Sequence, residues 1–123
     1  MTRINVHLDD VSDTGFELFP DGTYLVTIQP SSKIKQSDAG GAYIMCIAKC
    51  DEGELEGKLI GWNCSLLPQA LWNLKAMLEV IGIEWDEEGF ELEDLFDKQL
   101  LIDVSTRQWN NEDRNQVDGY HTV

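Results

Sequence analysis

The sequence predicts a β-rich fold with a single helix, whose elements follow the order β-β-β-α-β-β. Short stretches rich in β-branched and aromatic residues alternate with turns that contain Gly, Pro, Asn or Asp. One stretch, 68–81, places apolar residues at the three-and-four spacing of an amphipathic helix. The 123 residues contain no linker and no internal repeat, so residues 1–123 are expected to form one domain.

Five strands are expected, separated by turns, by the helix or by acidic loops. Their ranges are 23–28 with a continuation through 33–35, 42–49, 58–66, 98–108 and 114–123. The first follows a Pro-Asp-Gly turn, and Pro30 before its continuation indicates an edge strand or a bulge. In the fourth strand, the alternating residues Leu100, Ile102 and Val104 are expected to face inward.

Alternation alone does not decide which face of a strand is buried, because both faces of 42–49 contain apolar residues. One face holds Tyr43, Met45 and Ile47, and the other holds Ile44, Cys46 and Ala48. Burial or exposure of Tyr43 therefore stays open. The same is true of Trp62, which alternates with Ile60 and Cys64 in the third strand.

The helix is expected over 68–81, with Pro68 in its first turn and Gly82 at its C-terminal cap. Its apolar face consists of Ala70, Leu71, Leu74, Met77, Leu78 and Ile81. Such a stripe is typical of a helix that packs over the end of a sheet. We expect the nearby Trp72 and Trp85 to be core residues as well.

Three strands, one helix and two strands are the order of a five-stranded Greek-key barrel of the OB type. In that fold the helix connects the third and fourth strands. Closure of the barrel also removes the exposed edges that favour aggregation. The sequence therefore predicts an all-β OB-fold barrel with one helix.

The formal net charge of −14 is unusual for a protein that binds nucleic acid, because contacts to phosphates normally come from a basic surface. The acidic residues are concentrated in a few segments, however. Residues 84–97 contain eight acids and no base, and residues 51–57 contain four acids. Residues 21–50 and 58–83 each have a net charge of +1. A neutral or weakly basic face is therefore expected away from the acidic segments.

The sequence contains no pattern that indicates catalysis or a cofactor. It lacks the G-x-S-x-G, H-E-x-x-H and Walker motifs, and it has only two histidines, His7 and His121. The three cysteines, at positions 46, 50 and 64, have no CxxC spacing, so we expect structural thiols without zinc. The carboxylates of 84–97 lack EF-hand spacing, so no metal is expected there. We expect a protein that is not an enzyme and that has no cofactor.

No stretch of about 18 apolar residues is present, and the first residues lack the apolar core of a signal peptide. We therefore expect no membrane partner and an intracellular, cytoplasmic location.

Basic and aromatic residues gather where OB barrels bind nucleic acid, on the second and third strands and in the flanking loops. These candidate residues are Lys33, Lys35, Tyr43, Lys49, Lys58, Trp62, Arg107, Trp109 and Arg114. Cationic side chains can follow the phosphates while rings stack on the bases, which is how single strands are bound without sequence preference. A solubilising role is the alternative explanation for the lysines.

Several motifs occur in a recognisable order along the chain. They are Ile4-Asn5-Val6-His7-Leu8, the turn and strand at 19–28, the glycine-containing loop at 35–41, the turn at 52–58, the helix start at 65–75, and Trp109 with the hairpin strand at 114–120. Through them the chain resembles a family of phage-encoded OB-fold single-stranded DNA-binding proteins. That family is related to phage replication and recombination proteins that were long described only as a domain of unknown function.

This resemblance implies that the protein protects single-stranded DNA during phage replication or recombination, in the cytoplasm of an infected bacterial host. It also implies a contact region formed by Lys33, Lys35, Arg107, Trp109 and Arg114.

The acidic segment 84–97 leaves a second interpretation open. It is either a solvated loop or a surface that binds phage or host replication and recombination proteins. In the alternative function, the chain is an acidic OB-fold interaction module or a DNA mimic that binds a nucleic-acid-processing protein. A homodimer also stays open.

Overall fold

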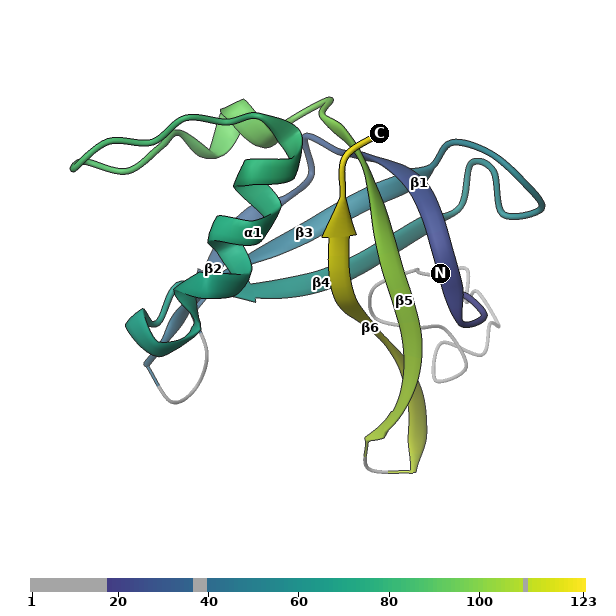
Figure 1. Cartoon of the computed structure of the whole chain (residues 1–123). Coiled ribbons are helices and arrows are strands. Elements are labelled where there is room, and N and C mark those ends of the chain that lie inside the picture. The colour runs from purple at the N-terminus through teal and green to yellow at the C-terminus, as the bar shows by residue number, and fades with distance from the viewer. Residues whose placement is uncertain (1–17, 37–39, 110) are drawn as a thin grey trace, which may run out of the picture.

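The computed structural model describes residues 18–36, 40–109 and 111–123. The 4–8 motif and His7 lie outside these residues. The strands are β1 (Gly22–Ile28), β2 (Lys33–Gln36), β3 (Ala42–Cys50), β4 (Leu59–Ser65), β5 (Gln99–Trp109) and β6 (Glu112–His121). The helix α1 (Leu71–Ile81) follows a short 3-10 turn, Pro68–Ala70, and a second 3-10 turn, Leu92–Leu95, precedes β5 (Figure 1).

The described residues confirm a β-rich fold with one α-helix, and all strand pairs are antiparallel. The sheet order is β2-β3-β1-β5-β6, and β4 pairs with the opposite edge of β3. The first predicted strand is divided into β1 and β2, both of which pair with the same edge of β3. Residues 26–28 of β1 lie opposite 48–50, while β2 lies opposite 42–45.

The division falls at Pro30, whose ring nitrogen has no hydrogen to donate to a neighbouring strand. At this point a side chain supplies the hydrogen bonds to β3. The hydroxyl of the buried Ser32 accepts a hydrogen bond from the Ile47 amide (2.9 Å) and donates one to the Ile47 carbonyl (3.2 Å). The same carbonyl also accepts a hydrogen bond from the Gln29 amide at 2.7 Å. The edge of β3 therefore stays hydrogen-bonded between the two strands.

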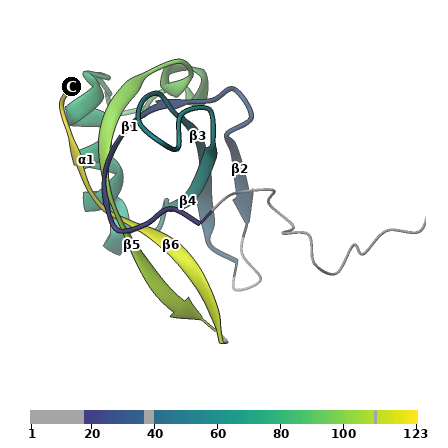
Figure 2. The same cartoon turned by 90° about the vertical axis from the view of Figure 1, so that its right-hand side faces the viewer.

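The sheet is strongly curved (Figure 2). As a result β4 and β6 approach each other, although β4 is hydrogen-bonded to β3 and β6 to β5. Between them, the rings of Trp62 and Tyr120 lie 6.4 Å apart, centroid to centroid. Burial raises the pKa of the Tyr120 hydroxyl well above its ordinary value. The helix α1 contacts β4, β5 and β6 beside this pair, as the sequence pattern predicts for a helix at the end of a sheet.

Alternation in β3 and β5 determines which side chains enter the core. Ile44, Cys46 and Ala48 are buried, whereas Tyr43, Met45 and Ile47 lie half-buried on the opposite face. Leu100, Ile102 and Val104 are buried, which confirms that prediction. All three cysteines are buried as free thiols, and burial raises the pKa of Cys64 to about 11.

The helix ends where the sequence indicates, because Gly82 adopts a left-handed conformation (φ 76°) and its amide bonds back to carbonyls of the last turn. Leu74, Met77 and Leu78 face the core. The expectation that Trp72 and Trp85 are core residues is wrong, since their exposed fractions are 71% and 43%. Trp72 lies on the side of the helix opposite the buried stripe, and Trp85 follows the Gly82 cap in the acidic loop.

No helix in the described part of the chain combines the length and the apolar character needed to cross a membrane.

Candidate nucleic-acid interface

The strands β2, β3 and β4 share a surface on the side of the sheet that faces away from the core, here called the outer face. Residues directly opposite in antiparallel strands project to the same side, so the register defines its members. They are Lys33, Lys35, Tyr43, Met45, Ile47, Lys49, Leu59, Gly61, Asn63 and Ser65. The outer face therefore brings together four of the residues that the sequence analysis selected.

The outer face contains three lysines and no acidic residue, and Asp51, two residues after Lys49, borders it with its carboxylate bound to the Thr27 hydroxyl. Lys33 and Lys35 lie opposite Met45 and Tyr43, and Lys49 lies opposite Leu59. Tyr43, Met45 and Ile47 form a half-buried apolar strip between these cations. Cations beside an accessible ring and apolar side chains suit a ligand that has both negative charges and flat apolar groups.

The segment that follows β4 lies against the beginning of β3, so the outer face continues into it. The amide of Leu66 donates to the carbonyl of Ala42 at 2.9 Å. Gly41 allows this close approach, because a Cβ built there would lie 3.2 Å from the Leu67 side chain. This contact holds the segment before α1 beside the loop between β2 and β3.

The hairpin of β5 and β6 places Arg107 and Arg114 directly opposite each other, and both side chains are exposed. Arg114 lies 3.5 Å from the Glu112 carboxylate, whereas Arg107 forms no ion pair among the described residues. Like charges on paired positions repel each other. An anion that bound between the two guanidinium groups would remove that repulsion.

The base of this hairpin is fixed by contacts with the chain segment before β1. The side chain of Asn115 accepts a hydrogen bond from the Phe19 amide (2.7 Å) and donates one to the Phe19 carbonyl (2.8 Å). The amide of Thr106 donates to the carboxylate of Asp21 at 2.9 Å. The ring of Phe19 is fully buried and packs edge-on against Tyr24. These contacts hold the strands that carry the two arginines.

Three other predicted site residues lie elsewhere or are only partly described. The prediction that Trp62 stacks on bases is wrong, because this residue points into the core with Ile60 and Cys64 and is only 7% exposed. Lys58 is exposed in the turn before β4 rather than in the strand itself. The backbone of Trp109 ends β5 opposite Glu112, while its side chain lies outside the described part.

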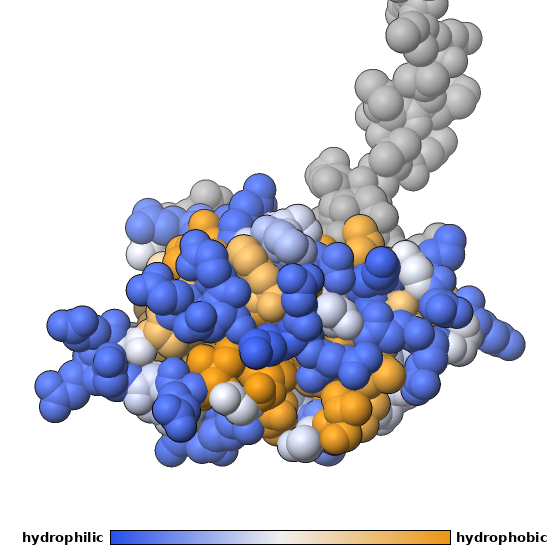
Figure 3. Space-filling model, turned by 90° about the horizontal axis from the view of Figure 1, so that it is seen from above, coloured by the Kyte–Doolittle hydropathy of each residue, from blue (hydrophilic) through white to orange (hydrophobic). Residues whose placement is uncertain are grey.

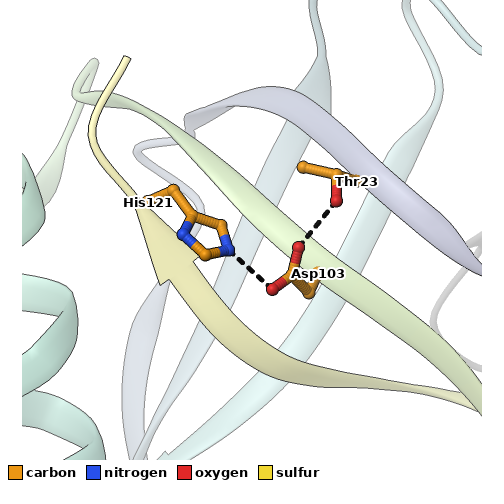
Figure 4. Close-up of polar contacts among 3 residues, drawn as sticks. All are labelled: Thr23, Asp103 and His121. Atoms are coloured by element: carbon orange, nitrogen blue, oxygen red, sulfur yellow. Dashed lines mark hydrogen bonds and ion pairs between the residues drawn. The ribbon is translucent and has the colours of Figure 1, made fainter.

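A second polar cluster, of Thr23, Asp103 and His121, ties β1, β5 and β6 together (Figure 4). The Thr23 hydroxyl donates to Asp103 Oδ1 at 2.7 Å, and His121 Nε2 lies 2.6 Å from Asp103 Oδ2. The hydrogen bond from Thr23, and then that from His121, lower the pKa of the Asp103 carboxyl. The imidazole contacts the carboxylate and not the hydroxyl, so this cluster joins strands and does not activate a nucleophile.

The acidic segments project at the two sides of the molecule. In Figure 1, the 51–57 turn extends to the right of the sheet and the loop at 84–91 extends to the left above α1. Figure 3 shows hydrophilic surface at both of these sides when the molecule is seen from above. The β5–β6 hairpin extends downward in Figure 1, away from both. The structure thus separates these two acidic segments from the hairpin arginines, whereas Glu112 and Asp113 lie in the hairpin itself.

The sequence reasoning missed one exposed apolar surface, at the start of α1. Leu67, Leu71 and Trp72 have exposed fractions of 41%, 41% and 71%, and Pro68 beside them is also exposed. A helical wheel gives a signal for Trp72, because that position lies opposite Leu74 and Leu78. The sequence gives no comparable indication that Leu71 is exposed, because its spacing fits the buried stripe.

The curved antiparallel sheet, the helix at its end and the acid-free outer face define a small β-rich protein with a candidate anion-binding surface. Over residues 4–123 the chain matches the model of a family described as "Protein of unknown function (DUF669)", and it belongs to that family. No match is found among curated proteins. The family description names no activity.

Proposed function

We propose that this protein binds single-stranded DNA without sequence preference, through the outer face and the β5–β6 hairpin. The observation that carries the proposal is the charge of the outer face, which has three lysines and no acid in a chain of net charge −14. Such a distribution is unexpected for a surface whose only role is solubility. Phosphates would contact the lysines, and bases would stack on Tyr43 and pack against Met45 and Ile47.

The hairpin supports the same proposal independently. Arg107 and Arg114 face each other across two strands whose base is fixed by Phe19 and Asn115. A backbone phosphate between the guanidinium groups would offset their repulsion through charge-assisted hydrogen bonds. The two arginines and the three outer-face lysines together offer five cations to one strand.

We further propose that the curved sheet is a barrel of the OB type. If the path from β1 through β2 counts as one interrupted strand, the order β4-β3-β1-β5-β6 corresponds to the third, second, first, fourth and fifth strands of that fold. The approach of β4 to β6, with Trp62 against Tyr120, supports closure between the two end strands. On this assignment, β3 and β4 are the strands that OB folds use to bind nucleic acid.

The biological role that fits this chemistry is protection of single-stranded DNA in phage replication or recombination, inside the infected bacterial cell. The proposed role is binding rather than catalysis. It rests on the sequence resemblance together with the outer face.

Fluorescence anisotropy with a labelled oligo-dT of about 15 nucleotides at low salt tests the binding proposal. We expect binding that weakens steeply as salt is added. Asn63→Glu places a negative charge on the β4 side of the outer face, where Asn63 is exposed opposite Met45, and should weaken binding strongly. Thr122→Glu adds the same charge at an exposed position after β6 and should leave binding nearly unchanged.

Absence of oligo-dT binding by the wild-type protein at low salt would contradict the proposal. The acidic sides of the molecule would then favour the alternative function, an interaction module or DNA mimic that binds a basic nucleic-acid-processing protein. In that case, replacing the acids of 84–97 with amides would abolish capture of the basic partner.

A further inference from the structure

The described residues give the exposed apolar surface at the start of α1 one role in the fold, the packing of Leu67 against Gly41. It consists of Leu67, Pro68, Leu71 and Trp72, here called the α1 patch. Trp72 is the most exposed of the large apolar residues in the described chain, at 71%. Its ring projects away from the buried side chains of Leu74, Met77 and Leu78. Exposing an indole to this extent costs solvation free energy, so its position calls for an explanation.

The electrostatic surroundings of the α1 patch distinguish it from the rest of this acidic chain. Residues 57–78 contain no acidic residue, although the whole chain has 23. Lys75 lies one helical turn after Trp72, and Glu79, two turns after it, lies 4.0 Å from Lys75. The other exposed tryptophan, Trp85, lies in the segment 84–97 with its eight acids. An anionic ligand would therefore be tolerated at Trp72 and repelled at Trp85.

The α1 patch is also continuous with the outer face. Leu67 packs against Gly41 at the beginning of β3, and the Leu66 amide bonds to the Ala42 carbonyl. The next residue of β3, Tyr43, belongs to the outer face and lies opposite Ser65 at the end of β4. A strand that leaves the outer face past Tyr43 and Ser65 would therefore reach Leu67 and the start of α1.

We propose that the α1 patch is a second contact site for the same single strand, in which a base stacks on the ring of Trp72. This inference rests on the proposed function and extends it, because it adds a stacking position beyond the sheet. It predicts that the protein occupies a longer stretch of DNA than the outer face alone can cover. It also assigns a binding role to a helix that would otherwise only close one end of the sheet.

The test compares two oligo-dT lengths, about 5 and about 15 nucleotides, which lie near the two ends of the range that one OB fold covers. Trp72→Ala should leave the affinity for the short oligomer unchanged. It should lower the affinity for the long oligomer about 5- to 150-fold, the effect of losing one base–aromatic stack. Trp72→Phe should restore part of the loss. Since Trp72 is exposed, its replacement should leave the thermal unfolding midpoint nearly unchanged, which circular dichroism checks.

Trp85→Ala is the matched control, because it removes an exposed tryptophan from an acidic environment and should change neither affinity. Equal affinities of the wild-type protein and Trp72→Ala for the long oligomer would overturn the inference and leave the proposed function standing. An equal loss in Trp85→Ala would overturn it as well. If Trp72→Ala instead turns a wild-type dimer into a monomer in light scattering, with DNA affinity unchanged, the α1 patch is an interface between copies of this chain. Failure of the wild-type protein to bind either oligomer would reject the proposed function itself.

Discussion

If the protein binds single-stranded DNA as proposed, the salt dependence of that binding follows from the number of cations that the structure offers to one strand. Five cations, Lys33, Lys35, Lys49, Arg107 and Arg114, lie on the outer face or on the β5–β6 hairpin. Each phosphate neutralised on a single strand contributes about −0.7 to the slope of log K against log salt. If all five contact phosphates, the wild-type slope is about −3.5.

The double variant Lys33→Gln/Lys35→Gln removes two of these contacts while keeping polar side chains that are only one atom shorter. The slope should become shallower, at about −2.1, and the affinity at about 0.1 M salt should fall roughly 25-fold. Neither lysine is buried, and their replacement should therefore leave the stability of β2 nearly unchanged. Anisotropy titrations with oligo-dT at four or more salt concentrations measure both quantities.

The control for net charge is Lys98→Gln, which removes one exposed lysine next to the acidic segment. Its slope should equal that of the wild-type protein. If overall charge rather than local contact set the affinity, Lys98→Gln would produce about half of the effect of the double variant. Such a result, or an unchanged slope in the double variant, would refute the assignment of Lys33 and Lys35 to the interface.

Three further predictions concern the fold. Ser32→Ala should lower the free energy of unfolding by about 1–3 kcal/mol, because it leaves a β3 amide without its partner, whereas Ser31→Ala at an exposed site should have little effect; urea titration measures both. Asp103→Asn should cost at most about 1 kcal/mol at pH 6, since the side chain is partly exposed. Because folding lowers the pKa of Asp103, its contribution is present above about pH 4 and is lost as the pH falls through the folded-state pKa, so urea titrations of wild type and variant should converge in acid. The three buried thiols should not react with a disulfide reagent at pH 8 until the protein is unfolded, since burial raises the pKa of Cys46 and Cys64.

Much of the fold was predictable because local patterns determine it. The β-branched stretches, the Pro-Asp-Gly turn and the three-and-four spacing of 68–81 predict the order of strands and helix. The division of the first strand was only partly predictable. Pro30 indicates an interruption, but nothing local shows that Ser32 bridges the gap to Ile47, since that contact spans 15 residues.

The candidate interface was harder to predict because each strand has two faces and only tertiary structure selects the buried one. The sequence left the burial of both Tyr43 and Trp62 open. In the structure Tyr43 is half-buried on the outer face, whereas Trp62 is buried in the core. Trp62 packs near Tyr120, which lies 58 residues away along the chain, since curvature brings β4 towards β6. Trp72 was assigned to the core because large apolar residues usually are buried, although its helical position indicates exposure.

The division between β1 and β2 has a consequence for local opening of the sheet. Because β2 has only four residues and contacts β3 along one edge, it can detach without disturbing the pairing of β1 with β3 and β5. Amide hydrogens of β3 that bond to β2 should therefore exchange with solvent through a low-energy opening, while those near Ala48 exchange only with larger unfolding. Lys33 and Lys35 travel with β2 in that opening, so its equilibrium sets how many cations the outer face presents at any moment. Bound DNA would slow this exchange by holding the short strand closed.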